Sequence, residues 1–275
     1  MKISIDLGGT NLRAAIVENG KILQMLSEPT LSSGSESEVM DRIIHMISAL
    51  RAQGKVEGIG IGVPSVVDNE RGIVYNVVGI PSWKEVHLKD ILEKETGLPV
   101  NIDNDCNCFA LGVSAFGEAK GFRDAVCVTL GTGVGSGIIV DGRLYRGHNT
   151  GAGEIGSLPY LDKDYEYYCS SRFFVGCGTT GKAAADAAAA GDPDALKIWN
   201  EFGAHMGDLV KLTMFAYDPG VIVFGGSISA AWPLFEKPML AGLSTFPYPT
   251  SLSRLTLRRT TLPNPGILGA SLLIK

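Results

Sequence analysis

The sequence predicts an α/β protein built from two related lobes. Segments with strand periodicity alternate with segments of helical periodicity, which is typical of the α/β class. Residues 3–17 and 126–140 repeat one pattern, in which two apolar runs flank a turn rich in Gly and Thr, as in a β-hairpin. The chain has 275 residues, more than a single core usually holds, so the repeat indicates a duplicated lobe.

The elements expected in the first lobe follow from periodicity and from helix start and stop signals. Beyond the first hairpin, apolar residues recur at helical spacing from Val39 to Leu50. Asn104 is placed to cap a helix, because its side chain can accept from N–H groups of the first turn. The expected elements are a helix over 36–53, a strand over 58–63, a helix over 86–96, a strand over 99–103 and a helix over 106–117. This lobe is expected to span 1–104.

The second lobe is expected to span 105–265. After its hairpin, the stretch 145–172 is polar and irregular. The elements expected beyond it are an Ala-rich helix over 182–190, a long amphipathic helix over 192–216 and a strand over 221–224. A terminal helix at about 266–275 is expected to return to the first lobe.

Composition limits the kinds of partner. The net charge of −5 leaves no basic surface for nucleic acid, so a small ligand is expected. The N-terminus reads as a strand rather than a signal segment, and no apolar run is long enough to cross a bilayer. The odd number of cysteines, five, suits reduced thiols. A cytoplasmic protein without membrane partners is therefore expected.

Three Gly-rich turns are candidate phosphate sites, because glycine lets successive N–H groups face an anion. The residues concerned are Gly8, Gly9, Thr10 and Asn11 in the first turn, Gly131, Thr132 and Gly133 in the second, and Gly225 and Gly226 after the strand at 221–224. A lone Gly-rich turn is more often only a tight turn. Asp6, at the end of the first strand, favours the phosphate interpretation, since it would hold Mg²⁺ directly or through water. The pattern is neither a Walker A loop nor a dinucleotide fingerprint.

These motifs together resemble the ROK group of sugar kinases and related regulators. The matching stretches are IDLGGTNLRAAIV, GIGVPSVVD, Asn104-Asp105-Cys106-Asn107, LGTGVGSGIIV, GAGEIGS and Phe224-Gly225-Gly226-Ser227. The resemblance covers essentially the whole chain. It implies a two-lobed fold of the actin-like (ribonuclease H-like) ATPase kind, with Mg-ATP and a hexose in an interlobe cleft and the adenosine at Gly225-Gly226.

The resemblance also implies residue roles at the sugar. Asp105 would be the base for the accepting hydroxyl, while Asn104, Glu154 and Glu166 would bind sugar hydroxyls. A first-turn position favours the ionised form of Asp105, although a second helix cap is the alternative. Glu154 lies in a Gly-rich loop, where a solvated acid is the alternative. Glu166 depends on aligning YEYYCSSRFF with a family pattern, and a surface turn is its alternative.

Two departures from the family pattern stand out. Ser157 replaces the histidine of the family's zinc motif and no cysteine cluster follows, so no zinc is expected. Packing of Leu158, Tyr160 and Leu161 is expected to hold the segment 157–170 instead. The loops at Pro64-Ser65 and at 79–83 also differ, on the sugar side.

The sequence thus predicts a transferase of carbohydrate metabolism: an ATP-dependent, magnesium-dependent, glucokinase-like hexose kinase. Its partners would be ATP and a hexose or hexose derivative, and a homodimer is compatible with the resemblance. One alternative is a catalytically weak or inactive sugar-binding protein with a sensing role. Another is an actin- or chaperone-like ATPase that uses no sugar.

Overall fold

The structure is a computed structural model, and it describes residues 1–149 and 151–274. The chain divides into two compact units. Unit 1 comprises 1–120, 144–152 and 262–275, and unit 2 comprises 121–143 and 153–261. None of the helices in the described residues is long and apolar enough to cross a membrane.

Unit 1 contains a five-stranded sheet in the order β3-β2-β1-β4-β8. Its strands are β1 (Lys2–Leu7), β2 (Asn11–Glu18), β3 (Lys21–Pro29), β4 (Ile59–Val63) and β8 (Val100–Asn104). Strands β1, β2 and β3 pair antiparallel, and β1, β4 and β8 pair parallel. The first predicted hairpin is confirmed as β1 and β2.

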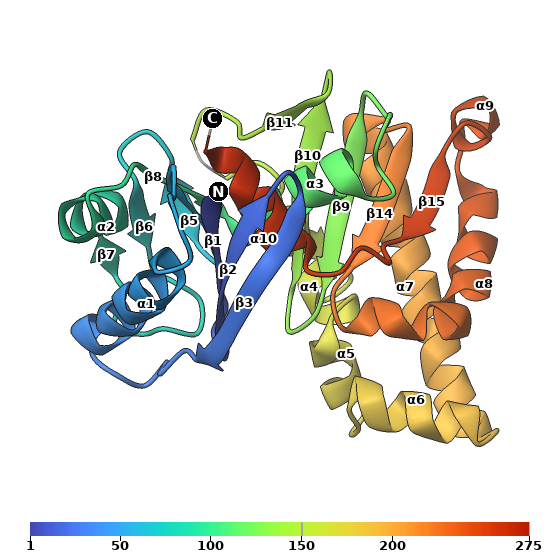
Figure 1. Ribbon diagram of the computed structural model, residues 1–275. Coiled ribbons are helices and arrows are strands. Elements are labelled where there is room, and N and C mark those ends of the chain that lie inside the picture. The colour runs from blue at the N-terminus through green and yellow to red at the C-terminus, as the bar shows by residue number, and fades with distance from the viewer. Residues whose placement is uncertain (150, 275) are drawn as a thin grey trace. The chain divides into compact units, whose positions relative to one another are not determined.

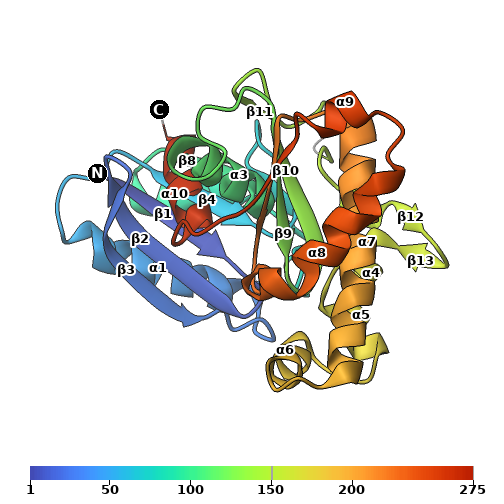
Figure 2. The ribbon, with the colours of Figure 1, turned by 90° about the vertical axis from the view of Figure 1, so that its right-hand side faces the viewer.

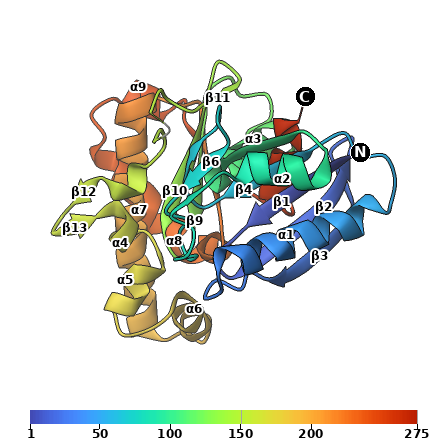
Figure 3. The same cartoon turned by 90° about the vertical axis from the view of Figure 1, so that its left-hand side faces the viewer.

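Helices cover both faces of this sheet. Helices α1 (Glu36–Arg51) and α2 (Leu88–Thr96) lie in front of the strands in Figure 3. Alternate strand residues, such as Ile3 and Ile5, join their apolar side chains in one buried core. Helices α3 (Asp105–Phe116) and α10 (Pro265–Ala270) cover the other face, and the short helix η4 (Ser271–Leu273) follows (Figure 1). Residue 275, within the expected terminal helix, lies outside the described residues.

The contact between α3 and α10 explains why the division differs from the sequence-based boundary at residue 104. Gly112 of α3 and Gly269 of α10 allow the two backbones to touch, and a Cβ on Gly269 would overlap the carbonyl oxygen of Cys108. Helix α3 therefore lies in unit 1, although the sequence analysis began the second lobe at residue 105.

Unit 1 also contains a small sheet between β4 and α2, where no strand was expected from the sequence. Its strands are β5 (Val66–Asp68), β6 (Ile73–Tyr75) and β7 (Glu85–Val86), in antiparallel order. Val86, expected to begin a helix, ends β7 instead, and α2 begins at Leu88.

The sheet of unit 2 repeats the strand order of the first. Its order is β11-β10-β9-β14-β15, with β9 and β10 antiparallel and β9, β14 and β15 parallel. The strands are β9 (Ala125–Leu130), β10 (Val134–Val140), β11 (Arg143–Tyr145), β14 (Val221–Gly225) and β15 (Thr256–Arg259). The second hairpin and the duplicated pattern of strands are therefore confirmed.

A long helix, α7 (Pro193–Tyr217), supplies much of the core of unit 2, together with α8 (Trp232–Gly242). Helix α8 packs against α7 (Figure 2). The remaining elements are short, apart from the expected Ala-rich helix. They are η1 (Ile155–Ser157), β12 (Pro159–Tyr160), β13 (Lys163–Asp164), α4 (Tyr165–Tyr168), α5 (Ser171–Gly176), α6 (Gly181–Ala189), η2 (Ile228–Ala231), η3 (Leu243–Thr245) and α9 (Pro249–Leu252). The stretch expected to be irregular thus contains short strands and helices.

Candidate functional site

The first Gly-rich turn, between β1 and β2, is held by a hydrogen bond within the turn and by two hydrogen bonds from Thr30. The Gly8 N–H donates to the carbonyl of Asn11 at 3.0 Å. The Thr30 hydroxyl donates to the Gly8 carbonyl at 2.6 Å, and the Thr30 N–H donates to the Thr10 carbonyl at 3.0 Å. The side chains of Thr10 and Asn11 are exposed at the tip. The turn is therefore a fixed backbone loop that offers its tip to solvent.

Gly9 packs against the loop at 79–83, one of the two that depart from the family pattern. A Cβ on Gly79 would lie 2.8 Å from the Cα of Gly9, and Gly79 has φ +81. Both glycines are needed for this approach, because a side chain on either would push the two backbones apart. The altered loop therefore directly contacts the first turn.

Asp6 carries an incompletely balanced charge at the end of β1. Burial raises the pKa of Asp6, and Arg13 opposes this only partly. Arg13 Nη1 lies 3.9 Å from Asp6 Oδ2, which is longer than a hydrogen bond. A desolvated, weakly paired carboxylate suits a divalent cation, and Mg²⁺ prefers oxygen ligands. The residues present therefore fit Mg²⁺ at Asp6.

Asn104 caps helix α3, as predicted. Its Oδ1 accepts from the N–H groups of Cys106 at 2.8 Å and Asn107 at 3.2 Å, while its Nδ2 donates to the Ser65 carbonyl at 3.2 Å. Asp105 follows in the first turn, where its Oδ1 also accepts from Cys106 N–H at 2.8 Å. The helix-cap alternative for Asp105 therefore has a contact in its favour.

Asp6 and Asp105 lie on the same side of the sheet. Asp6, Gly62 and Asp103 are neighbours across β1, β4 and β8, on the face that α3 covers. Gly62 leaves room for Cys108 of α3, whose sulfur would lie 3.2 Å from a Cβ there. Burial, and then the charges of Asp103, Asp105 and Asp6, raise the pKa of the Cys108 thiol. Three carboxylates are thus near enough to raise the pKa of one thiol.

Asp103 is a buried acid that the sequence analysis did not single out. Its Oδ1 accepts from Asn107 Nδ2 at 2.8 Å and from Asn104 N–H at 2.9 Å. Its Oδ2 accepts from Arg146 Nε at 2.7 Å. Because Asp103 is an acid within the apolar run at 99–103, the sequence could have indicated a buried, paired carboxylate there. Nothing in the sequence indicated that Arg146 would be its partner.

The second Gly-rich turn lies between β9 and β10. The Gly131 N–H donates to the Gly133 carbonyl at 3.0 Å, and the Ser171 N–H donates to the Gly131 carbonyl at 2.9 Å. Thr132 is exposed at the tip, as Thr10 is in the first turn. The two turns therefore share both a backbone closure and an exposed threonine.

The third glycine turn lies beside the second. Gly225 pairs with Thr129 of β9. Gly226 has φ +84, and a Cβ on it would overlap the carbonyl oxygen of Leu130. Unit 2 thus brings two of the three predicted nucleotide turns together.

Glu166 rests on the second turn. Its Oε2 accepts from Val134 N–H at 3.3 Å, and its Oε1 pairs with Arg172 Nη2 at 2.9 Å. A Cβ on Gly133 would overlap this carboxylate. A residue predicted for the sugar thus touches one predicted for the nucleotide, and Arg172 is a neighbour that the sequence analysis missed.

Glu154 lies between Gly153 and Gly156, and both glycines are in close contact with the backbone of β10. Ser136 Oγ donates to the Gly153 carbonyl at 2.6 Å, and a Cβ on Gly156 would overlap the carbonyl oxygen of Val134. Desolvation, followed by the negative charge of Glu166, raises the pKa of Glu154. The two glutamates are therefore near enough to influence each other.

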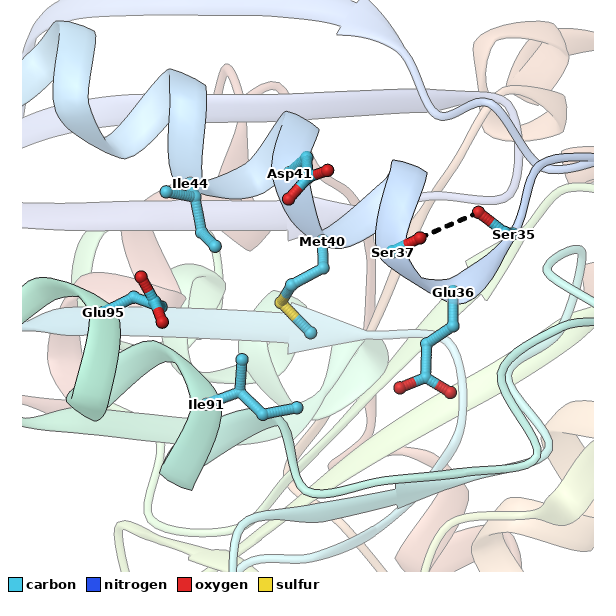
Figure 4. A pocket seen from close by; sticks show the side chains of 8 residues that line it. All are labelled: Ser35, Glu36, Ser37, Met40, Asp41, Ile44, Ile91 and Glu95. Atoms are coloured by element: carbon cyan, nitrogen blue, oxygen red, sulfur yellow. Dashed lines mark hydrogen bonds between the residues drawn. The ribbon is translucent and has the colours of Figure 1, made fainter.

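A groove on unit 1 contains none of these residues. It has a volume of about 640 Å³ and lies between α1 and α2, with Met40, Ile44 and Ile91 facing it (Figure 4). Glu36, Asp41 and Glu95 also line it, and an acidic lining does not suit a phosphate ligand. The candidate site therefore remains at the Gly-rich turns and the start of α3.

Comparisons with known proteins agree with these motifs. The ROK family model matches residues 2–275. The chain belongs to the ROK family. A glucokinase from Thermotoga maritima is 30% identical over 306 residues, covering 99% of this chain and 96% of that protein.

ROK proteins of known structure share this fold. A ROK glucokinase from Streptomyces griseus, solved with glucose and AMPPNP, is 27% identical, with a TM-score of 0.83 and coverage of 99% and 98% of the two chains. The α/β, actin-like ATPase fold predicted from the sequence is thereby confirmed. The ROK relatives also include the DNA-binding transcriptional repressor Mlc of Escherichia coli, 26% identical over 268 residues, covering 86% of this chain and 66% of Mlc.

Proposed function

We propose that this ROK protein transfers the γ-phosphoryl group of ATP to a hydroxyl of a hexose, as a glucokinase-like kinase. The observation that carries the proposal is the position of Asp105 in the first turn of α3, on the same sheet face as Asp6. The glucokinases among its relatives support sugar phosphorylation.

The proposed nucleotide residues are those of the three glycine turns. The turns at 8–11 and 131–133 would bind phosphate oxygens through backbone N–H groups, and Gly225-Gly226 would lie on the adenosine side. Mg²⁺ would be held by Asp6, directly or through water, and would supply neutralisation of phosphate charge.

The proposed sugar residues are Asn104, Asp105, Glu154 and Glu166. Asp105 would accept the proton of the attacking hydroxyl, since the positive end of a helix dipole favours its ionised form. The carboxylates of Glu154 and Glu166 would accept hydrogen bonds from sugar hydroxyls, which fixes the orientation of the ring. Catalysis would thus depend on positioning and charge neutralisation. A cytoplasmic location and a homodimer belong to the same proposal.

A second candidate is a sugar-binding protein that senses rather than phosphorylates. The pairing of Glu166 with Arg172 favours it, because this contact occupies a carboxylate that the kinase would use for the sugar. The DNA-binding transcriptional repressor Mlc among the relatives also supports a regulatory role.

A coupled assay with Mg-ATP and a panel of hexoses, N-acetylhexosamines and fructose distinguishes the candidates. The proposal predicts ADP release that depends on one class of sugar, with formation of a sugar phosphate. Sugar binding without turnover would instead support the sensor, and ATP hydrolysis that no sugar changes would support an ATPase.

A further inference from the structure

The segment after Glu154 carries residues that do not fit the zinc site of its family. Ser157, at the expected histidine position, offers only an exposed hydroxyl. Cys169 is fully buried, and burial together with Asp208 raises the pKa of its thiol. Among residues 1–149 and 151–274, no group of three or more His, Cys, Asp and Glu side chains could hold a metal ion. Contacts other than metal ligands must therefore hold the segment at 157–170.

The packing predicted for the segment is partly wrong. Leu158 and Leu161 are 41% and 69% exposed, so they do not anchor it. Tyr160 does, because its ring stacks on Tyr165 with centroids 4.2 Å apart and meets the edge of Tyr168 at 5.4 Å. Tyr165 and Tyr168 are the ends of α4, the helix that carries Glu166.

The Tyr160 hydroxyl is fixed by two groups of α7. It donates to Asp208 Oδ2 at 2.5 Å and lies 3.0 Å from His205 Nδ1. A phenol has one proton and spare acceptor capacity, so His205 Nδ1–H donates to the same oxygen. The hydroxyl thus links β12 to α7 by two hydrogen bonds.

The charges around this hydroxyl favour the same arrangement. Despite burial, hydrogen bonds from Lys211 and Tyr160 lower the pKa of Asp208, so it is an ionised acceptor. Burial lowers the pKa of His205, against the influence of Glu201 and Asp208, so its ring is neutral near pH 7. Hydrogen bonds to charged groups are stronger than neutral ones, which makes the Tyr160–Asp208 contact the firmest link.

We propose that Tyr160, His205 and Asp208, here named the tyrosine anchor, hold α4 so that Glu166 stays on the second Gly-rich turn without a metal. All these residues belong to unit 2. Tyr160 is a positioning residue in this proposal, since it acts through Glu166. The consequence for sugar binding rests on the proposed function, whereas the consequence for Glu166 does not.

The test compares Tyr160→Phe with Tyr168→Phe. Both changes remove one tyrosine hydroxyl that bonds an aspartate, but Tyr168 bonds Asp162 at the surface. Hydrogen–deuterium exchange would follow the backbone of 131–135 and 162–171, which includes the Val134 N–H that donates to Glu166. Tyr160→Phe should speed exchange in both segments, and Tyr168→Phe should leave 131–135 as in the wild type. Unchanged exchange at 131–135 in Tyr160→Phe would overturn the anchor.

Binding measurements distinguish a failure of the tyrosine anchor from a failure of the proposed function. Calorimetry should show hexose affinity about tenfold weaker in Tyr160→Phe, because supporting partners keep a binding group oriented. ATP affinity should fall less, because Glu166 would bind the hexose directly and affects ATP only through the turn at 131–133. Equal losses for both ligands would mean general loosening and would contradict positioning. If the wild type binds no hexose, the proposed function fails while the exchange result still decides the anchor.

Should Tyr160→Phe not fold, Asp208→Asn carries the same test, because it keeps the shape and removes the charged acceptor.

Discussion

Arg146 donates from Nε to Oδ2 of Asp103 at 2.7 Å, and Asp103 is almost wholly buried. The contact ties Arg146, which precedes Glu154 in the chain, to the strand end that precedes Asp105. Both residues lie in unit 1. A buried carboxylate that also accepts from Asn104 and Asn107 thus fixes the start of α3.

Replacing Arg146 should therefore cost stability. Arg146→Ala leaves one oxygen of a buried carboxylate without its charged donor, which is expected to lower the free energy of unfolding by about 1–3 kcal/mol. Arg146→Lys keeps a charge and should lose less. Urea unfolding of the three proteins measures this, and an Ala variant as stable as the wild type would show that the contact contributes nothing.

Gly269→Ala should destabilise the packing of α3 on α10. The added Cβ would overlap the backbone oxygen of Cys108, which cannot rotate away. The expected loss is at least the upper end of the about 1–3 kcal/mol seen for overpacking. Gly131→Ala is the control, since a Cβ there meets nothing within 4 Å. Similar melting temperatures for both variants would contradict this packing.

Gly133→Ala should weaken sugar binding through Glu166. The new methyl would displace the carboxylate that rests on the turn, while Gly131→Ala, in the same turn, would not. We expect the sugar KM of Gly133→Ala to rise about tenfold above that of Gly131→Ala, because a binding group moved by about 1 Å loses much of its effect. Equal sugar KM values in steady-state assays would exclude a role for this contact.

Stability should fall in mild acid partly through His205. Burial lowers its pKa below the ordinary 6.5, so on acidification the unfolded chain takes up this proton before the folded protein does. This contribution is therefore present above about pH 6.5 and decreases as pH falls towards the lower folded-state pKa. His205→Gln should show a smaller drop in melting temperature between about pH 7.5 and about pH 5.5. A drop as large as that of the wild type would mean that other groups control acid stability.

The parts of the fold that could be predicted carry local signals. Helix α1 shows in the spacing from Val39 to Leu50, and the start of α3 shows in Asn104, whose side chain makes the predicted cap. The short strands β5, β6 and β7 carry no such pattern, since they form only by pairing with one another. Helix α8 contains Pro238 in its interior. Because proline is disfavoured inside a helix, the sequence did not predict this helix.

The candidate site was predictable only as separate motifs. The glycine turns and first-turn acids stand out because each is short and contiguous. The contacts that support them join distant positions, such as Asp103 with Arg146 and Tyr160 with Asp208, and no spacing rule connects such pairs. The prediction that Leu158 and Leu161 anchor their segment was wrong, because an apolar residue need not be buried.

The central claim, that Asp105 accepts the proton of a sugar hydroxyl, is tested most directly by the kcat of Asp105→Asn on the best sugar of the panel. Asn keeps the shape and caps a helix as well as Asp does, so the melting temperature should barely change. Removing the proton acceptor should lower kcat about 10²- to 10⁴-fold, with much smaller changes in sugar and ATP affinity. A stable variant with near-normal kcat would contradict the claim and leave Asp105 as a helix cap.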